Sequence, residues 1–346
     1  MGARQTEEMA GKIIFGNLPG DDRKMLLEQL RMRTGIEEFV LEKDWWVTQV
    51  LRALFVLPYA RHLSFKGGTS LSKCWGVIDR FSEDIDIGIA REFLGFSGDL
   101  SKTQISDKLR RAACSFVRER LQHELREQMK SNGIDGDAFS VRVNITPVTT
   151  TDPEIIELEY SSAMGEHPYL RHVVKIEVSG RSMHEPLKEH GIRSLIAENL
   201  PDSVFAEDSC PIMAVVPERT FLEKVMLLHE EFAKPLPSIR TERMSRHMYD
   251  LYRMLQTPIA DRALSDCDLY RAVMEHRRKF IGLKGFDYDT LLPATLSLEI
   301  PANVESLWRE DYEKMCRTMI YGEKPSWNLL VESISALQSR IRNIAF

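Results

Sequence analysis

Apolar and polar residues alternate along this chain with two different periods, and the period changes near residue 216. Before that point, several short segments alternate apolar and polar side chains, which is typical of β-strands. After it, the strong apolar patterns repeat at three- and four-residue spacing, as in amphipathic helices. Strands therefore cluster in the first part and helices in the second. This segregation predicts an α+β fold class and argues against a doubly wound α/β sheet.

The predicted strands are short and rich in Val and Ile. They cover residues 62–66, 84–89, 140–145, 154–160, 173–178 and 210–216. In the first part, helices are predicted from residue 42 to Pro58 and over 101–130. In the second part, they are predicted over 217–232, 244–255, 269–279, 304–320 and 327–344. We predict a sheet-containing domain of residues 1–216 with flanking helices, followed by a helical domain of residues 217–346.

Composition and charge exclude several classes of protein. The 346 residues include 46 Lys and Arg against 52 Asp and Glu, and 43% of them are hydrophobic, values typical of a globular protein rather than a disordered one. The longest apolar run contains Pro58 and is far shorter than the ~20 residues of a membrane span, so no membrane partner is expected. Five cysteines without CxxC or zinc-site spacing favour a reducing compartment, which predicts a cytoplasmic protein.

The strongest chemical signal begins at a pair of glycines. The segment Phe65-Lys66-Gly67-Gly68-Thr69-Ser70 has the pattern of a strand, a turn and the start of a helix. Glycines let the backbone approach a ligand closely, and the free N–H groups of a helix N-terminus attract phosphate. The Ser70 hydroxyl would add one more donor. We therefore predict that Lys66, Gly67, Gly68 and Ser70 bind a nucleotide.

Two aspartates follow on a predicted strand. Ile85, Ile87 and Ile89 fall on one face of it, and Asp84 and Asp86 fall on the other. Their Cα atoms should lie about 7 Å apart, from a rise of ~3.3 Å per residue, so both carboxylates can reach one divalent cation or bridge two. Mg²⁺, or Mn²⁺, prefers such hard oxygen ligands. The pattern predicts phosphoryl or nucleotidyl transfer, in which a metal activates a hydroxyl and neutralises the leaving pyrophosphate.

Four segments together resemble a known family. They are Glu42-Lys43-Asp44-Trp45-Trp46-Val47, Phe65-Lys66-Gly67-Gly68-Thr69-Ser70-Leu71-Ser72-Lys73, Arg80-Phe81-Ser82-Glu83-Asp84-Ile85-Asp86 and Ser245-Arg246-His247-Met248-Tyr249-Asp250-Leu251-Tyr252. The glycine and DxD segments are similar to the signature of the polymerase-β-like nucleotidyltransferase superfamily. The closer resemblance, over about residues 36–256, is to the AbiEii-type nucleotidyltransferase toxins. Fifteen residues separate Gly68 from Asp84, more than the superfamily usually shows, although the AbiEii-like group tolerates this spacing.

The resemblance implies a third metal-binding carboxylate on a neighbouring strand. Glu177 is the candidate to join Asp84 and Asp86, because it lies on the polar face of the strand predicted over 173–178. An exposed strand face explains Glu177 about equally well. Glu157 and Glu159, on the preceding strand, are alternatives.

The resemblance also implies two site residues in the helical part. In the related toxins, a lysine on the helix after residue 217 and the aspartate of a later Tyr-Asp-Leu segment complete the active site, and here these are Lys224 and Asp250. Lys224 would hold a triphosphate as a point charge, and Asp250 would orient Lys224 or act as a base. The active site is then expected in a cleft between the two parts. Thr220 and Glu223 fit a helix capping box, so Glu223 is predicted to be structural.

The function implied by the resemblance is that of a metal-dependent nucleotidyltransferase that uses an NTP. It would be the toxin of a bacterial toxin–antitoxin or phage-defence system, restrained by an antitoxin protein. Related toxins modify the acceptor end of tRNA, so an RNA acceptor, with tRNA favoured, is expected. Segments 102–130 and 271–284 each carry an excess of four positive charges, which suits RNA, although a solvated helix face explains them as well. Transfer of a nucleoside monophosphate to a protein or small molecule, and a catalytically silent binding module, remain alternatives.

Overall fold

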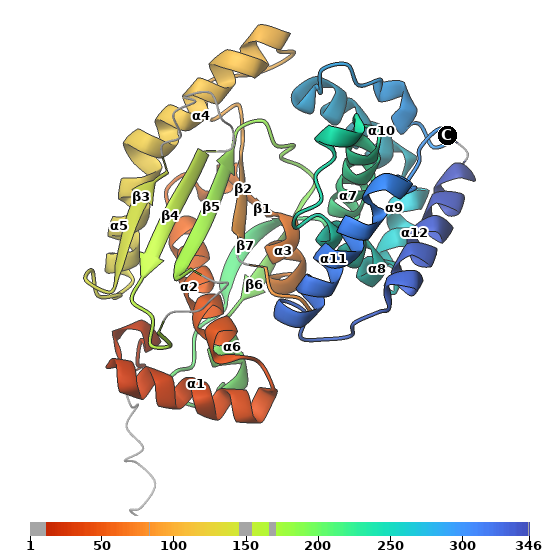
Figure 1. The fold of residues 1–346 in the computed structure, drawn as a ribbon. Helices are drawn as coiled ribbons and strands as arrows, with labels where there is room; N and C mark the ends of the chain where they lie inside the picture. The colour runs from red at the N-terminus through yellow and green to blue at the C-terminus, as the bar shows by residue number, and fades with distance from the viewer. Residues whose placement is uncertain (1–11, 83, 145–153, 166–170, 345) are drawn as a thin grey trace, which may run out of the picture.

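The computed structural model describes residues 12–82, 84–144, 154–165, 171–344 and 346, and Figure 1 shows its fold. A sheet with flanking helices forms one side of the molecule, and a bundle of helices from the C-terminal half forms the other. The predicted α+β fold class is confirmed. Glu83 of the DxD segment and Ile145 of the third predicted strand lie outside the described residues.

Within the described ranges, seven strands form one mixed sheet in the order β3-β4-β5-β2-β1-β7-β6. Strand β2 pairs antiparallel with β1 and parallel with β5, so the DxD segment lies in the middle of the sheet. The edge strand β6 was not predicted from the sequence, because only its last residue, Ile192, is buried. The strands are β1 (Leu63–Lys66), β2 (Asp84–Ile89), β3 (Phe139–Val143), β4 (Glu154–Tyr160), β5 (Val173–Ser179), β6 (Leu187–Ile192) and β7 (Cys210–Val215).

Helix α2 packs against the sheet and is buried along almost its whole length. It contacts strands β5 and β7 and helices α1, α5 and α6, which explains why Trp45 and Trp46 are both almost fully buried. The helix predicted over 101–130 is one helical run with two wider turns, and its last section packs on β3. The helices of this part are α1 (Gly20–Thr34), α2 (Glu38–Leu54), η3 (Gln104–Leu109), α4 (Arg110–Phe116), η4 (Val117–Leu121), α5 (Gln122–Ser131) and α6 (Leu195–Asn199).

The helical part is built around α7 and α8. Helix α7 contacts α8, α9 and α10, while α11 and α12 pack on α8. These helices share one apolar core that includes Phe221, Tyr249 and Trp308, whereas the sheet and α2 share another. Apart from Leu71, Val77 and Ile78, the buried residues of the helical core lie after residue 216, and the domain boundary there stays a prediction. The helices are α7 (Pro217–Phe232), α8 (Ser245–Leu255), α9 (Ile259–Ser265), α10 (Cys267–His276), η6 (Arg277–Ile281), α11 (Ala302–Thr318) and α12 (Trp327–Arg342).

Helix α3 (Gly67–Lys73) and the segment after it join the two parts. Leu71 and Ile78 belong to the core of the helical part, although they lie between β1 and β2 in the sequence. The Phe81 N–H donates to the Met319 carbonyl at 2.7 Å, and Arg80 forms a β-bridge with Ile320. The long spacing between Gly68 and Asp84 therefore has a structural role, since it carries Arg80 into the helical part.

None of the helices in the described ranges is long and apolar enough to cross a lipid bilayer.

Candidate active site

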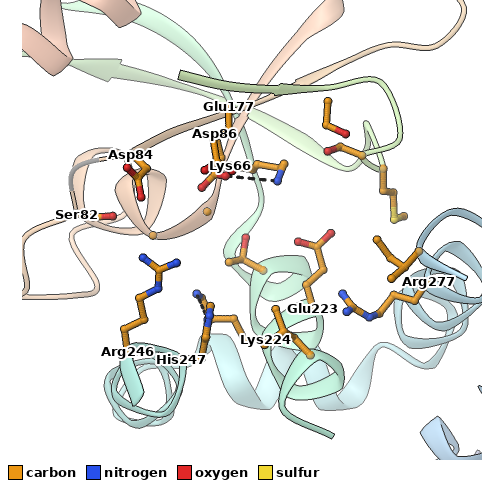
Figure 2. Close-up of a pocket in the computed structure, with 18 of the residues that line it drawn as sticks. Lys66, Ser82, Asp84, Asp86, Glu177, Glu223, Lys224, Arg246, His247 and Arg277 are labelled. Atoms are coloured by element: carbon orange, nitrogen blue, oxygen red, sulfur yellow. Dashed lines mark hydrogen bonds and ion pairs between the residues drawn. The ribbon is translucent and has the colours of Figure 1, made fainter. Parts of the chain in front are cut away.

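A cavity of about 380 Å³ opens between the sheet and the helical part (Figure 2). Strands β1, β2 and β5 and the glycine turn line one side of it, and helices α7, α8 and α10 line the other. This arrangement agrees with the cleft implied by the resemblance. Seven of the sequence-predicted site residues line the cavity, namely Lys66, Gly67, Gly68, Asp84, Asp86, Glu177 and Lys224.

The glycine turn packs directly on the aspartates and their neighbours. Gly67 has a positive φ of 78°, a conformation that glycine adopts without strain, and a Cβ atom there would overlap Asp86 Oδ2. A Cβ atom at Gly68 would lie 2.6 Å from Arg80 Nη2. Both positions therefore need glycine so that the carboxylate and the guanidinium can approach the backbone.

Ser70 does not contact the cavity, contrary to the prediction that it binds the nucleotide. Its side chain is fully buried, and its hydroxyl donates to the Gly67 carbonyl at 2.9 Å. Ser70 lies three residues after Gly67, the first residue of α3, and its hydrogen bond back to Gly67 stabilises the glycine turn. A different serine, Ser82, lines the cavity and accepts a hydrogen bond from the Thr69 hydroxyl at 2.9 Å.

The carboxylates of the sheet lie next to each other on two parallel strands. Asp86 on β2 pairs in register with Glu177 on β5, and Asp84 precedes Asp86 by two residues. Burial, followed by the nearby charges of Asp86 and Asp84, raises the pKa of the Glu177 carboxyl. Lys66 Nζ lies 3.9 Å from Asp86 Oδ1, which offsets only part of this negative charge.

The alternative third carboxylates lie elsewhere. Glu157 and Glu159 are on β4, one strand farther from β2 than Glu177 is. Arg142 Nη2 contacts both, at 3.0 Å from Glu157 and 2.6 Å from Glu159. The sheet therefore brings Glu177 to the cavity and pairs the other two with arginine.

The three carboxylates predicted to bind metal do not converge on one point. No group of three or more His, Cys, Asp or Glu side chains in the described part of the chain is placed to hold a metal ion. Figure 2 shows Asp84 apart from Asp86 and Glu177, on the side of Ser82, and Arg243 Nη2 lies 4.0 Å from its Oδ2.

The carboxylates on the sheet side of the cavity, which we call the sheet wall, are still suitable ligands for a divalent cation. Asp86 and Glu177 offer adjacent carboxylate oxygens in a cavity that is open to a ligand. Mg²⁺ is usually bound by one or two protein carboxylates together with waters and substrate phosphates, so it does not require a complete protein cage. Asp86 and Glu177 are the pair that the sheet places side by side, with Asp84 two residues before Asp86, and metal binding by the three carboxylates stays a prediction.

On the opposite side of the cavity, which we call the helical wall, Arg80 and Lys224 form a buried network of ion pairs around Asp250. This side chain is fully buried, and Arg80 donates to it twice, from Nε at 2.7 Å and from Nη2 at 2.8 Å. Lys224 Nζ lies 2.8 Å from Asp250 Oδ2. Burial by itself would raise the pKa of Asp250, but Arg80 and Lys224 hold it well below its usual range. Because both oxygens are engaged by cations, the structure favours the orienting role for Asp250 over the role of a base.

The model of one family, described as nucleotidyl transferase AbiEii toxin, type IV TA system, matches residues 49–337. The chain belongs to the AbiEii family. The match starts after Glu42-Lys43-Asp44-Trp45-Trp46-Val47 and continues beyond residue 256 into α12, so it covers the glycine turn, the DxD segment and the helical wall. No curated protein matches the sequence.

The AbiEii fold also brings to the cavity residues that sequence reasoning did not assign to the site. Arg80 and Arg246 both line it, and both lie within the four segments that carry the family resemblance. Burial, with further contributions from Arg80 and Arg243, lowers the pKa of Arg246. His247 Nδ1 lies 3.4 Å from Lys224 Nζ, and burial keeps its pKa well below the ordinary value.

The predicted capping box at Thr220 and Glu223 is not present. Helix α7 begins at Pro217 and its N-cap is Val216, so Thr220 lies inside the helix. Glu223 accepts a hydrogen bond from Arg219 Nε at 3.0 Å and lines the cavity. Proline at the first helical position starts the helix earlier than the Thr-Glu spacing suggests.

The two basic segments are largely matched by acidic neighbours. In segment 102–130, Arg118 pairs with Glu154 at 2.7 Å, and in segment 271–284, Arg277 pairs with Glu230. The remaining pairs in these segments include Arg111–Asp107, Arg120–Glu124, Lys130–Glu127, Arg278–Asp289 and Lys279–Asp99. Acids outside the segment therefore pair with three cations of 271–284 but, among these pairs, with only Arg118 of 102–130, and contact of these segments with RNA stays a prediction.

Proposed function

We propose that this AbiEii family member transfers a nucleotide from an NTP to a hydroxyl of an RNA acceptor, with tRNA as the first candidate, and that Mg²⁺ or Mn²⁺ is required. One observation carries the proposal. A single cavity combines the glycine turn, the Asp86–Glu177 pair and, on the facing wall, the cations Lys224 and Arg246. Carboxylates for a cation and fixed cations for phosphates are the groups that nucleotidyl transfer needs.

Each wall has a distinct part in the proposed reaction. Asp86 and Glu177 would hold the divalent cation, which when bound activates the attacking hydroxyl and neutralises charge on the phosphates. The backbone at Gly67 and Gly68 would receive phosphate oxygens at close approach, and Lys66 beside it would contribute a positive charge. The acceptor hydroxyl loses its proton to solvent, its oxygen forms a bond to the α-phosphorus, the bond from that phosphorus to the oxygen between the α- and β-phosphates breaks, and pyrophosphate leaves.

The helical wall positions the triphosphate. Lys224 is fixed by Asp250, which Arg80 holds in turn, so its amine reaches the cavity in one orientation. Arg246 supplies a second cation on the next helix. Burial lowers the pKa of Lys224, while Asp250 and the incoming phosphates favour its charged form. Preorganised cations of this kind stabilise charge that develops on the leaving group.

Membership in a type IV toxin–antitoxin family gives the biological setting. We propose that the transfer inhibits growth when the chain is produced alone and that a cognate antitoxin protein relieves this inhibition. The acceptor follows from the family resemblance, since related toxins modify tRNA.

A transfer assay tests the proposal. Purified protein is incubated with each α-labelled NTP, Mg²⁺ and, separately, total RNA, isolated tRNA and protein extract. Label in tRNA supports the proposal, and label in protein or a small molecule favours the alternative acceptor. NTP binding without any transfer would leave a silent nucleotide-binding module. The Asp86→Asn variant should be inactive, and Glu159→Gln, a carboxylate change on the same sheet outside the cavity, should be active.

A further inference from the structure

The two ends of the cavity differ in charge. Figure 2 shows Arg246 on the side of Asp84, whereas Glu223 and Arg277 lie toward the other end. Burial would raise the pKa of Glu223, but neighbouring cations lower it to about 2, so this side chain is an anion. Arg277 is already paired, since its Nε donates to Glu230 at 2.7 Å. A polyanion such as RNA is therefore expected to approach the cavity from the end of Asp84 and Arg246.

Arg246 is a cation at this end that the protein itself does not pair. It lines the cavity, and its guanidinium has no hydrogen-bonding partner in the part of the chain that the structure describes. Burial, followed by the charges of Arg80 and Arg243, lowers its pKa. The charges of Asp84 and Asp250 offset this only in part. An anion bound nearby would favour the charged form further, so this end suits a negatively charged ligand.

Arg243 extends the positive end to the surface of the molecule. It lies in the turn before α8, and its side chain is 42% exposed. Its Nη2 lies 4.0 Å from Asp84 Oδ2, and Asp84 lines the cavity from β2. Because Arg243 comes from the helical part and Asp84 from the sheet, this arginine lies at the edge of the cavity, where the two parts face each other.

The backbone of Arg243 is in an unfavourable conformation. Its φ of 59° lies in the left-handed region, and among the residues that the structure describes no other residue except glycine has a positive φ. Such a conformation costs free energy in a residue with a Cβ atom, and it often occurs at functional sites. Asp311 on α11 holds the turn, since its Oδ1 accepts from the Arg243 N–H at 2.6 Å and its Oδ2 accepts from the Ser245 N–H at 3.0 Å.

Capping of α8 does not account for an arginine in this turn. The N-cap residue Met244 makes no side-chain hydrogen bond to the helix, so Asp311 supplies the cap from α11. A glycine at position 243 would adopt the same φ without strain and would present the same N–H to Asp311. What glycine would lack is the guanidinium beside Asp84. The strained turn is therefore better explained by the position of the arginine side chain than by the cap.

We propose that Arg243 binds a phosphate of the acceptor RNA, next to the hydroxyl that attacks the NTP. The inference rests on the proposed function and names a residue that binds the acceptor and not the NTP. With the triphosphate at the glycine turn and Lys224, the end near Asp84 is left for the acceptor hydroxyl. RNA carries a phosphate at each nucleotide, so a strand whose end enters the cavity places one at the edge. A guanidinium there can donate two parallel hydrogen bonds to it.

The variant Arg243→Gly gives the first test, because it should not reduce stability while it weakens RNA binding. Glycine relieves the strained φ, so the thermal midpoint should stay the same or rise. Loss of the guanidinium should weaken equilibrium binding of total tRNA by about tenfold or more, the value of one contact to a charged group. The slope of log affinity against log salt concentration should decrease by about one. Unchanged tRNA affinity and an unchanged slope would overturn the proposal.

Two further variants make this test specific. Arg243→Ala removes the guanidinium and keeps the Cβ atom, so it should lose the same tRNA affinity, and it decides the question if Arg243→Gly does not fold. The matched control is Arg340→Ala, which removes an exposed arginine that pairs with Asp261 outside the cavity. Its tRNA affinity and salt slope should equal those of the wild-type protein. Equal losses at positions 243 and 340 would reflect only a general attraction for RNA and would contradict the proposal.

NTP binding distinguishes an acceptor phosphate from a phosphate of the NTP. Arg243 is not among the residues that line the cavity, so the affinity of Arg243→Gly for a non-hydrolysable NTP analogue should be unchanged, while its KM for tRNA in the transfer assay rises. Weaker NTP binding with unchanged tRNA binding would assign Arg243 to the triphosphate and overturn the inference.

The same assays separate this inference from the proposed function. If the wild-type protein labels tRNA and Arg243→Gly labels it with the same KM, the transfer proposal stands and the role of Arg243 fails. If the wild-type protein labels protein and not RNA, or binds no tRNA, the proposed RNA acceptor fails, and the role of Arg243 fails with it.

Discussion

The two walls of the cavity have opposite electrostatic states. On the sheet wall, Asp86 and Glu177 lie in register with one lysine nearby, and the pKa of Glu177 is raised by burial and by the charges of Asp86 and Asp84. On the helical wall, Asp250 is fully buried between Arg80 and Lys224, and its pKa is lowered by those cations. One wall has an excess of negative charge, whereas on the other a single carboxylate, Asp250, faces two cations.

This difference indicates what each wall offers a ligand. The carboxylates of the sheet wall gain stability when a divalent cation binds, whereas the buried Asp250 has its cation partners once the chain has folded. Loss of one charge should therefore have opposite consequences for stability on the two walls, although both losses should reduce transfer.

The largest expected effect is on the sheet wall. Asp86→Asn removes a proposed metal ligand, so nucleotide transfer should fall by about 10²–10³-fold, the range seen when one electrostatic catalytic group is lost. Its thermal midpoint should not fall, because repulsion with Glu177 is relieved. Labelled-NTP transfer and thermal unfolding measure the two effects. Glu177→Gln should behave in the same way and Glu159→Gln should not. A fully active Asp86→Asn protein would contradict the proposed role.

The helical wall should respond mainly through stability. Asp250→Asn leaves Arg80 and Lys224 without their shared anion, and breaking a buried pair of this kind typically costs about 3–5 kcal/mol. Urea unfolding monitored by circular dichroism measures the free energy of unfolding. An Asp261→Asn control removes only an exposed pair with Arg340 and should change it by less than about 1 kcal/mol. If Asp250→Asn is as stable as the control, the network has no structural role.

Lys224→Ala should reduce nucleotide binding with a smaller loss of folding stability than Asp250→Asn. The lysine amine lines the cavity, so NTP affinity should fall by about tenfold or more, the value of one charge-assisted contact. Titration with a non-hydrolysable NTP analogue measures this affinity. Lys234→Ala, which removes a partner of Glu231 at the end of α7, serves as the control. Equal NTP affinity of the two variants would exclude Lys224 from triphosphate binding.

The smallest expected effect is a pH dependence of stability. Because the folded-state pKa of Asp250 is lowered, its stabilisation is complete above its ordinary value of 3.8 and is lost as the pH falls below that value. The free energy of unfolding of the wild-type protein should decrease in this acid range, and Asp250→Asn should show a smaller decrease. Parallel pH profiles for the two proteins would contradict this assignment.

The sequence was sufficient for the features that depend on local pattern. The alternation of Ile85, Ile87 and Ile89 predicted β2, and the helical periods after residue 217 predicted the second core. Edge strand β6 was not predicted, because a strand with only one buried residue shows no alternation of apolar and polar side chains. The family resemblance, not the pattern, was needed to predict Lys224 and Asp250.

The site features that the sequence did not predict depend on where each side chain points once the chain has folded. Nothing in the sequence distinguishes the roles of Ser70 and Ser82. In the structure, the Ser70 hydroxyl donates to the Gly67 carbonyl, whereas Ser82 lines the cavity. Arg80 reaches Asp250, which is 170 residues away along the chain. Glu223 fitted a local capping pattern. In the structure it accepts a hydrogen bond from Arg219 and lines the cavity.

A crystal structure with Mg²⁺ and a non-hydrolysable NTP analogue tests the central claim, that both walls act on one nucleotide, most directly. The expected result is a metal ion bound by Asp86 and Glu177 and by phosphate oxygens, with the triphosphate at the Gly67–Gly68 turn and within reach of Lys224 and Arg246. A nucleotide bound elsewhere, or one whose phosphates contact only one of the two walls, would contradict the claim.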